Sequence, residues 1–131
     1  MSKRLVIDSN VWISALVFGG TPRHIFENIV RSGDAIIMSE EISSEIRRIL
    51  KQKFPSFIVD FEELLVALRL RLEFVKLGTI TVSVCRDSND NMVIETALTG
   101  RARIIITGDK DLLDLGLYSG VTMTRPQDFL W

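Results

Sequence analysis

Short apolar runs alternate with amphipathic stretches along this chain. Residues 4–7, 35–38 and 104–106 are mostly apolar, as is typical of parallel strands buried on both faces of a sheet. Residues 79–85 and 121–124 are rich in β-branched residues and predict two further strands. Between the strands, apolar residues recur with the period of an α-helix. The predicted helices span residues 10–17, 21–31, 40–53, 55–76, 90–98 and 112–115, and a final helical turn spans residues 124–131.

This alternation of strands and helices predicts a three-layer α/β sandwich with a mainly parallel sheet, formed by residues 1–131 as one domain. No internal repeat, linker or low-complexity segment interrupts the pattern. A carboxylate, Asp8, directly follows the first strand. Ligands of open α/β sheets bind beyond the carboxyl ends of the strands, so Asp8 stands where a functional residue is expected.

Two of the predicted helices raise specific expectations. In the helix after the second strand, Ser39 caps the first turn, and Glu45 lies at the border of the apolar stripe, within reach of the sheet edge. The long helix, residues 55–76, carries two apolar rows on nearly opposite faces. The first row is Phe61, Leu64, Leu65, Leu68, Leu72 and Val75, and the second is Val59, Val66, Leu70 and Phe74. A surface helix needs one such row, so the second should contact either another helix of this chain or a second subunit.

Composition narrows the class of protein. The chain has 131 residues, of which 47% are hydrophobic and 25% charged, enough for one ordinary globular core. Its net charge of −1 provides no overall basic field for nucleic acid, which leaves local basic patches. The single Cys85 excludes an internal disulfide and a CxxC metal cluster. No apolar run is long enough to span a membrane and residues 1–4 lack a signal-peptide pattern, so we expect a cytoplasmic protein without membrane contact.

Four acidic residues share one predicted position, the carboxyl edge of the sheet. They follow successive strands or lie on the helices after them, and they are Asp8, Glu45, Asp90 and Asp109. Carboxylates brought close together raise one another's pKa values, and a divalent cation relieves that repulsion. Mg²⁺ and Mn²⁺ prefer such oxygen ligands, and an ion held this way can neutralise a phosphodiester oxygen and activate water. The four acids therefore form a candidate Mg²⁺ or Mn²⁺ site.

Taken together, several segments resemble the PIN-domain family. They are residues 7–10 (Ile-Asp-Ser-Asn), Glu45, residues 87–91 (Asp-Ser-Asn-Asp-Asn) and residues 107–112 (Thr-Gly-Asp-Lys-Asp-Leu). The last two segments, with residues 125–130, resemble the branch that contains toxin components of toxin–antitoxin pairs. The resemblance covers the whole chain in order. It implies a Rossmann-like PIN fold, metal-dependent cleavage of single-stranded RNA, a protein antitoxin as partner, and a homodimer or higher homo-oligomer.

The resemblance also implies roles for individual residues. The acids that match the catalytic and metal-binding quartet are Asp8, Glu45, Asp90 and Asp109. The residues expected to support them through hydrogen bonds or additional charge are Ser9, Asn10, Asp87, Thr107 and Asp111. The basic residues on the helix of Glu45 that can hold RNA phosphates are Arg47, Arg48 and Lys51. In-line attack of water on phosphorus would then leave products with a 5′ phosphate.

Each of these features also has a simpler structural interpretation. Asp8 with Asn10 fits an ordinary strand-to-helix turn, because Asp and Asn favour such positions. Asp87, Asp109 and Asp111 can each cap the helix that follows, and for Asp87 and Asp111 this is the favoured interpretation. The basic residues on the helix of Glu45 fit a solvated helix face. The residues expected to pack or cap locally, in the core or at an interface, are Trp12, His24 and Trp131.

Other functions compete with the nuclease. A haloacid-dehalogenase-like phosphatase also has an Asp after its first strand and a late Gly-Asp pair, here Gly108-Asp109, but needs an acid where this chain has Asn10. A response-regulator receiver needs adjacent acids early in the chain and an Asp at the third strand, and neither is evident. The chain can also be a catalytically silent PIN-like module that binds RNA or a protein.

Overall fold

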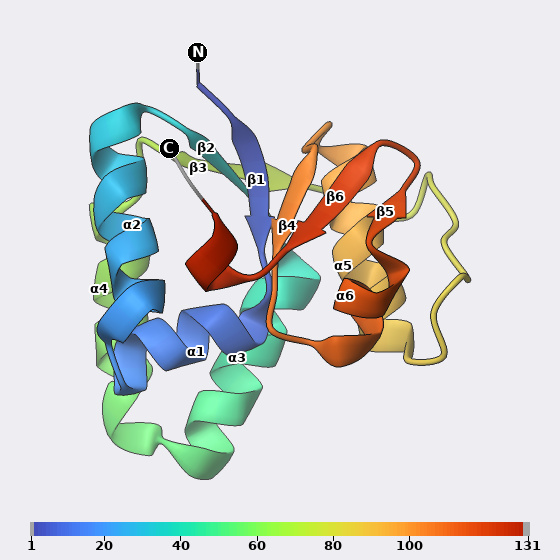
Figure 1. Cartoon of the computed structure of the whole chain (residues 1–131). Coiled ribbons are helices and arrows are strands. Elements are labelled where there is room, and N and C mark those ends of the chain that lie inside the picture. The colour runs from blue at the N-terminus through green and yellow to red at the C-terminus, as the bar shows by residue number, and fades with distance from the viewer. Residues whose placement is uncertain (1, 130–131) are drawn as a thin grey trace.

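The computed structural model describes residues 2–129, and its strands form a single sheet in the order β3-β2-β1-β4-β6-β5 (Figure 1). All neighbouring strands are parallel except β5, which runs antiparallel to β6. The strands are β1 (Arg4–Ile7), β2 (Ala35–Ser39), β3 (Leu72–Val75), β4 (Ile104–Ile106), β5 (Leu117–Tyr118) and β6 (Val121–Thr124). The helices are α1 (Ser9–Val17), α2 (Gly20–Ser32), α3 (Glu40–Lys53), α4 (Ile58–Ala67), α5 (Ser88–Thr99) and α6 (Lys110–Leu115), with 3-10 turns η1 (Pro55–Phe57) and η2 (Pro126–Asp128).

Helices cover both faces of this sheet, which confirms the predicted three-layer α/β arrangement. On one face, α1, α2 and α4 share an aromatic cluster in which the Trp12 ring lies 4.5 Å from Phe26 and 5.8 Å from Phe61, centroid to centroid. On the other face, α5 packs so closely that a Cβ atom at Gly100 would overlap the side chain of Ile37 in β2. Trp12 is fully buried, as expected of a core residue.

The chain between residues 55 and 85 differs from the prediction of one long helix followed by a strand. Helix α4 ends at Ala67, and residues 72–75 form β3, which pairs in parallel with β2 along its whole length. Arg4 secures this edge strand through two hydrogen bonds to Glu73, with N···O distances of 3.1 and 2.6 Å. Residues 79–85 form no strand, because the edge of β2 where a third strand would add is already taken by β3.

The two predicted apolar rows differ in burial in the structure. Phe61 and Leu68, from the first row, are buried in the core as predicted. The second row is exposed in the isolated chain, with exposed fractions from 55% for Phe74 to 81% for Leu70. The expectation that this row meets another helix of the chain is therefore wrong for the described residues. Contact with a second subunit stays a prediction.

The remaining elements agree with the sequence to within a few residues. Ser39 caps α3 as predicted, with its Oγ accepting a hydrogen bond from the backbone N–H of Ile42. His24 pairs locally with Glu27 on α2. Residues 126–128 form the predicted terminal turn, whereas Trp131 lies outside the described residues. Between residues 2 and 129, no helix is both long and apolar enough to cross a membrane.

Candidate metal centre

Asp8 is placed by the junction between β1 and α1, where it caps the helix. Its Oδ1 accepts a hydrogen bond from the backbone N–H of Ser9 at 2.8 Å, and its Oδ2 accepts one from Thr107 Oγ1 at 2.8 Å. The residue is only 6% exposed. Burial raises the pKa of Asp8 to about 6, against the two hydrogen bonds, and the charges of Glu45 and Asp109 add to the rise.

Thr107 connects this carboxylate to the second acidic segment. The residue is fully buried just after β4, where its backbone N–H donates to the carbonyl of Thr124. Its hydroxyl donates to Asp8 and accepts a hydrogen bond from the backbone N–H of Asp109 at 2.9 Å. The predicted supporting position of Thr107 thus corresponds to a hydrogen-bonded bridge between residues 8 and 109.

Three carboxylates meet beside this bridge. Asp90, Asp109 and Asp111 each offer an oxygen, and these atoms all lie within 4.8 Å of one another. Asp90 stands in the first turn of α5 and is buried, whereas Asp109 caps α6. Burial raises the pKa of Asp90 to about 7, and the charges of Asp109, Asp87, Asp8 and Asp111 add to this rise.

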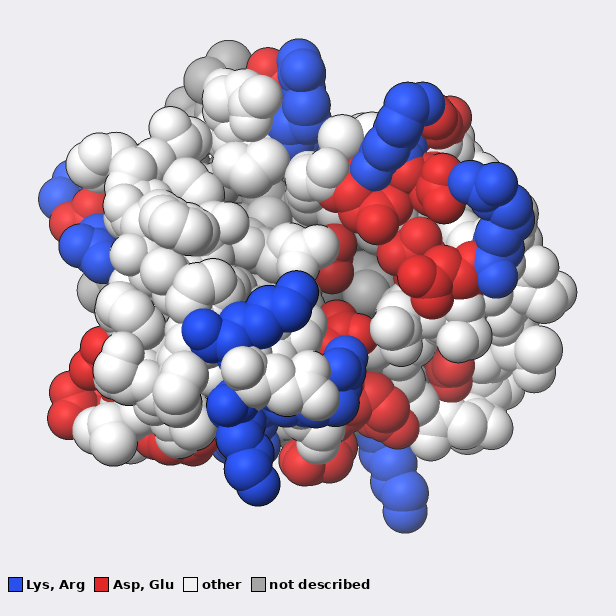
Figure 2. Space-filling view, turned by 90° about the horizontal axis from the view of Figure 1, so that it is seen from below, with Lys and Arg blue, Asp and Glu red and all other residues white. Residues whose placement is uncertain are grey.

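Glu45 reaches the same region from the other side. It is half-buried on α3, and its charge contributes to the raised pKa of Asp8. Together with Arg48 and Asn89 it lines a hollow of about 360 Å³ between α3 and the start of α5. Figure 2, which looks onto the carboxyl edge of the sheet, shows acidic side chains gathered around a depression that basic side chains border. Asp8 and Glu45 are not part of the tight group of three carboxylates.

The supporting residues predicted around the acids occupy different surroundings. Asp87 caps α5 through a hydrogen bond from the backbone N–H of Asn89 to its Oδ1 at 2.9 Å, as the capping interpretation expected. Ser9 is buried, and its Oγ has no hydrogen-bond partner among residues 2–129. Asn10 is exposed and its side chain makes no hydrogen bond within the same range. Asp111 was expected to cap α6, but Asp109 caps it and Asp111 joins the acidic group instead.

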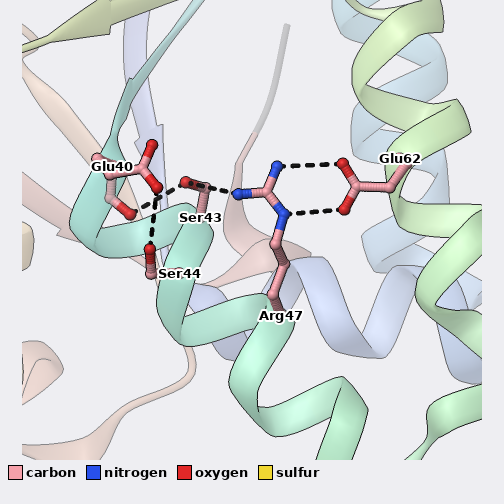
Figure 3. A network of polar contacts seen from close by, with 5 residues as sticks. All are labelled: Glu40, Ser43, Ser44, Arg47 and Glu62. Carbon is pink, nitrogen blue, oxygen red and sulfur yellow. Dashed lines mark hydrogen bonds and ion pairs between the residues drawn. The ribbon is translucent and has the colours of Figure 1, made fainter.

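Arg47, predicted to hold RNA, is engaged in an ion-pair network (Figure 3). Its Nε and Nη2 donate to the two carboxylate oxygens of Glu62 on α4, at 2.8 and 3.1 Å. Its Nη1 donates to Ser43 Oγ at 3.5 Å, and its guanidinium lies 5.5 Å from the centre of the Phe61 ring. Arg47 therefore joins α3 to α4, and an RNA contact would compete with this pairing.

The other basic residues are distributed differently. Arg48 and Lys51 are exposed on α3, and neither has an ion pair within the described part of the chain. A basic residue that the sequence did not single out, Arg86, pairs with Asp111. In the sequence, only its position next to Asp87, in the polar loop before α5, pointed to Arg86. That position does not predict an ion pair with a residue 25 positions later.

This donor set fits a hard divalent cation. Every ligand candidate is a carboxylate oxygen, which Mg²⁺ and Mn²⁺ prefer, whereas softer metals prefer sulfur or imidazole nitrogen. Burial is the main cause of the raised pKa values of Asp8 and Asp90, and the negative charges of the neighbouring acids add to the rise. A divalent cation would offset both effects. The unpartnered Ser9 Oγ lies one residue from Asp8, in the same buried corner.

The sequence and the fold of this chain are both similar to those of known proteins. The sequence model of the PIN domain family matches residues 4–111. The chain is 34% identical over 119 residues to an uncharacterized protein of Methanocaldococcus jannaschii, and the match covers 86% of this chain and 74% of that protein. Its fold is similar to that of a chain in the crystal structure of VapBC2 from Rickettsia felis bound to a DNA fragment from their promoter. That match has a TM-score of 0.63 at 11% identity and covers 93% of this chain and 98% of the other.

Proposed function

Because this chain belongs to the PIN domain family, whose members are generally nucleases, we propose that it is a divalent-metal-dependent endoribonuclease that cleaves single-stranded RNA. The family predicted from the sequence is confirmed, whereas the RNA substrate and the metal requirement belong to the proposal. The observation that carries it is the meeting of Asp90, Asp109 and Asp111 within 4.8 Å. The buried Asp8 acts electrostatically on the same group.

We assign the metal to Asp8, Asp90 and Asp109, with Glu45 as a ligand that binds directly or through water. Asp111, within 4.8 Å of two of these acids, adds negative charge to the site. When bound, Mg²⁺ or Mn²⁺ supplies Lewis acidity that activates water and neutralises the charge developing on a phosphodiester. The chain contributes the fixed position of the acids. Thr107 holds Asp8 and the backbone of Asp109 through one hydroxyl, which limits their relative movement.

The partners follow from the same proposal. The chain would act as the toxin of a toxin–antitoxin pair, in the cytoplasm, with a small protein as antitoxin. Support comes from the resemblance of residues 87–91, 107–112 and 125–130 to toxin components and from the fold shared with a chain of VapBC2. A homodimer or higher homo-oligomer is supported by the exposed apolar row of Val59, Val66, Leu70 and Phe74, whose burial would be favourable.

A cleavage assay tests this function. A single-stranded RNA oligonucleotide with a 3′ fluorophore is incubated with the protein in Mn²⁺ and, separately, in EDTA. We expect cleavage to 5′-phosphorylated products in Mn²⁺ alone and its loss in Asp90→Asn. Glu63→Gln, which removes an exposed acid on α4, is the matched control and should cleave normally. Cleavage by Asp90→Asn at the rate of the unmodified protein would exclude the assigned site. Release of phosphate from small esters, with RNA left intact, would indicate a phosphatase instead.

A further inference from the structure

Arg86 contacts the acidic group, and its side chain connects no two helices or strands of the described residues. Its Nη2 donates to both carboxylate oxygens of Asp111, at 3.0 and 3.1 Å. Within residues 2–129, it is the only basic side chain ion-paired with one of the three clustered acids, since the neighbouring Lys110 pairs with Asp114. The Arg86 side chain is 87% exposed. It therefore lies at the rim of the acidic depression and buries almost no surface.

The backbone that carries Arg86 is held on both sides by α5. Before it, the Asn91 side chain brackets Cys85: the backbone N–H of Cys85 donates to Asn91 Oδ1 at 2.8 Å, and Asn91 Nδ2 donates to the Cys85 carbonyl at 3.1 Å. After it, Asp87 caps α5. The guanidinium is thus a solvent-exposed group on a fixed base, next to the helix that carries Asp90.

The negative charge of the site favours a positively charged side chain at its entrance. A phosphodiester that approaches the depression meets the negative charges of Asp8, Glu45, Asp90, Asp109 and Asp111. One divalent ion compensates only part of that charge, so a second cation near the entrance would favour binding of a polyanion. A guanidinium has five N–H donors, and only those on Nη2 are used by Asp111 in Arg86. Its planar fork matches the geometry of phosphate oxygens.

We propose that Arg86 binds an RNA phosphate beside the scissile bond, exchanging Asp111 for that phosphate when a divalent ion neutralises the acids. This inference rests on the proposed ribonuclease function and adds a substrate-binding residue to it. Two effects of opposite sign follow. Removal of the guanidinium weakens RNA binding, because a phosphate contact is lost. It also strengthens binding of Mn²⁺ in the absence of RNA, because a competing positive charge beside Asp111 is lost.

The test compares Arg86→Gln, Arg86→Lys and the control Arg69→Gln. Arg69 precedes β3 and so lies at the amino edge of the parallel sheet, away from the acids. Binding of a fluorescent single-stranded RNA is followed by anisotropy in Ca²⁺, Mn²⁺ affinity by calorimetry without RNA, and cleavage by KM and kcat in Mn²⁺. For Arg86→Gln we expect Kd and KM for RNA to rise about tenfold, and the salt dependence of binding to fall by about one phosphate contact.

The accompanying expectations separate a substrate contact from a structural ion pair. Arg86→Gln should bind Mn²⁺ more tightly, by about twofold to fivefold, and Arg86→Lys should lie between Arg86→Gln and the unmodified protein. Arg69→Gln should match the unmodified protein. Unchanged RNA affinity and KM in Arg86→Gln, with or without a lower melting temperature, would overturn the inference. If the unmodified protein cleaves no RNA, the proposed function fails, and the anisotropy comparison still decides whether Arg86 contacts RNA.

Discussion

Acidic residues occupy two contrasting kinds of surroundings in this molecule. At the junction of α3 with α4 and at the edge strand β3, each acid has its own arginine: Glu62 pairs with Arg47, and Glu73 pairs with Arg4. Hydrogen bonds from these guanidinium groups hold the pKa of both glutamates below the usual range. At the carboxyl edge, burial raises the pKa of Asp8 to about 6.

This difference distinguishes acids that stabilise the fold from acids that form the candidate site. Paired acids connect elements of the fold and leave no local excess of charge. The acids of the depression are gathered by the ends of β1 and β4 and the start of α5, and the residues around them leave their charge largely uncompensated. Such an arrangement costs folding free energy unless a cation is bound, which points to a task other than stability.

The largest expected effect is on catalysis. Asp8→Asn should reduce Mn²⁺-dependent RNA cleavage by more than about a hundredfold, because a metal ligand is replaced by a neutral amide. The same variant should be more stable than the unmodified protein in EDTA, by about 1–2 kcal/mol, because a buried charge is removed. Urea denaturation and the cleavage assay measure the two effects. Loss of both activity and stability would mean that Asp8 serves the fold.

The next effect is the pH dependence of stability without metal. The raised pKa values mean that folded Asp8 and Asp90 retain protons which the unfolded chain releases near pH 4. Stability is therefore greatest below about pH 4 for these two groups and declines as pH rises through about 6 and 7. We expect the free energy of unfolding in EDTA to fall by about 4 kcal/mol from pH 5 to pH 8.

Mn²⁺ should reverse this decline at pH 8, since it binds the charged carboxylates of the folded state. Asp8→Asn should show a shallower slope than the unmodified protein. The paired glutamates, Glu62 and Glu73, do not interfere, because their lowered pKa values confine their contribution to lower pH. A free energy of unfolding that rises from pH 5 to pH 8 in EDTA would contradict the uncompensated charge.

A smaller effect is expected from the scaffold pair. Glu62→Gln weakens the Arg47 network shown in Figure 3 and should lower the free energy of unfolding by about 0.5–1 kcal/mol, since both side chains are partly exposed. Mn²⁺ affinity and kcat should not change. A large loss of Mn²⁺ affinity in this variant would show that the α3–α4 junction is coupled to the acidic site.

The smallest effect concerns the exposed basic residues of α3. Arg48→Gln should raise the Kd for RNA about twofold to fourfold, because Arg48 lines the hollow beside Glu45 and has no ion pair to break among residues 2–129. Arg47→Gln should affect stability more than RNA affinity, because its guanidinium is already bound by Glu62. Equal effects of the two variants on RNA affinity would show that Arg47 leaves its partner when RNA binds.

The sequence predicted correctly those strands whose local pattern does not also fit a helix. Strands β1, β2 and β4 are apolar runs too short for a helix, and they are typical of a sheet covered on both faces. Residues 72–75 were misassigned because Leu72 and Val75 also continue the helical spacing of the residues before them. Pairing with β2 is a long-range contact, and it outweighs the local pattern there.

The candidate site shows the same division. The places of Asp8, Asp90 and Asp109 could be predicted, because acids that follow parallel strands end at one edge of the sheet. Asp109 and Asp111 were both candidate caps of α6, and the sequence favoured Asp111. The choice depends on where α6 begins, and the structure starts it at Lys110, so that Asp109 caps it and Asp111 joins the acidic group. The contact of Arg86 with Asp111 depends on the path of residues 76–87, an irregular segment in which the sequence predicted a strand over residues 79–85.

A crystal soaked in Mn²⁺ shows whether the acids at the carboxyl edge form a divalent-metal site. Anomalous scattering from manganese should give a peak among the carboxylates of Asp8, Asp90 and Asp109, and the peak should vanish in Asp90→Asn. A fully soaked crystal with no anomalous peak in this depression, or with Arg86 occupying it in place of the ion, would contradict the account.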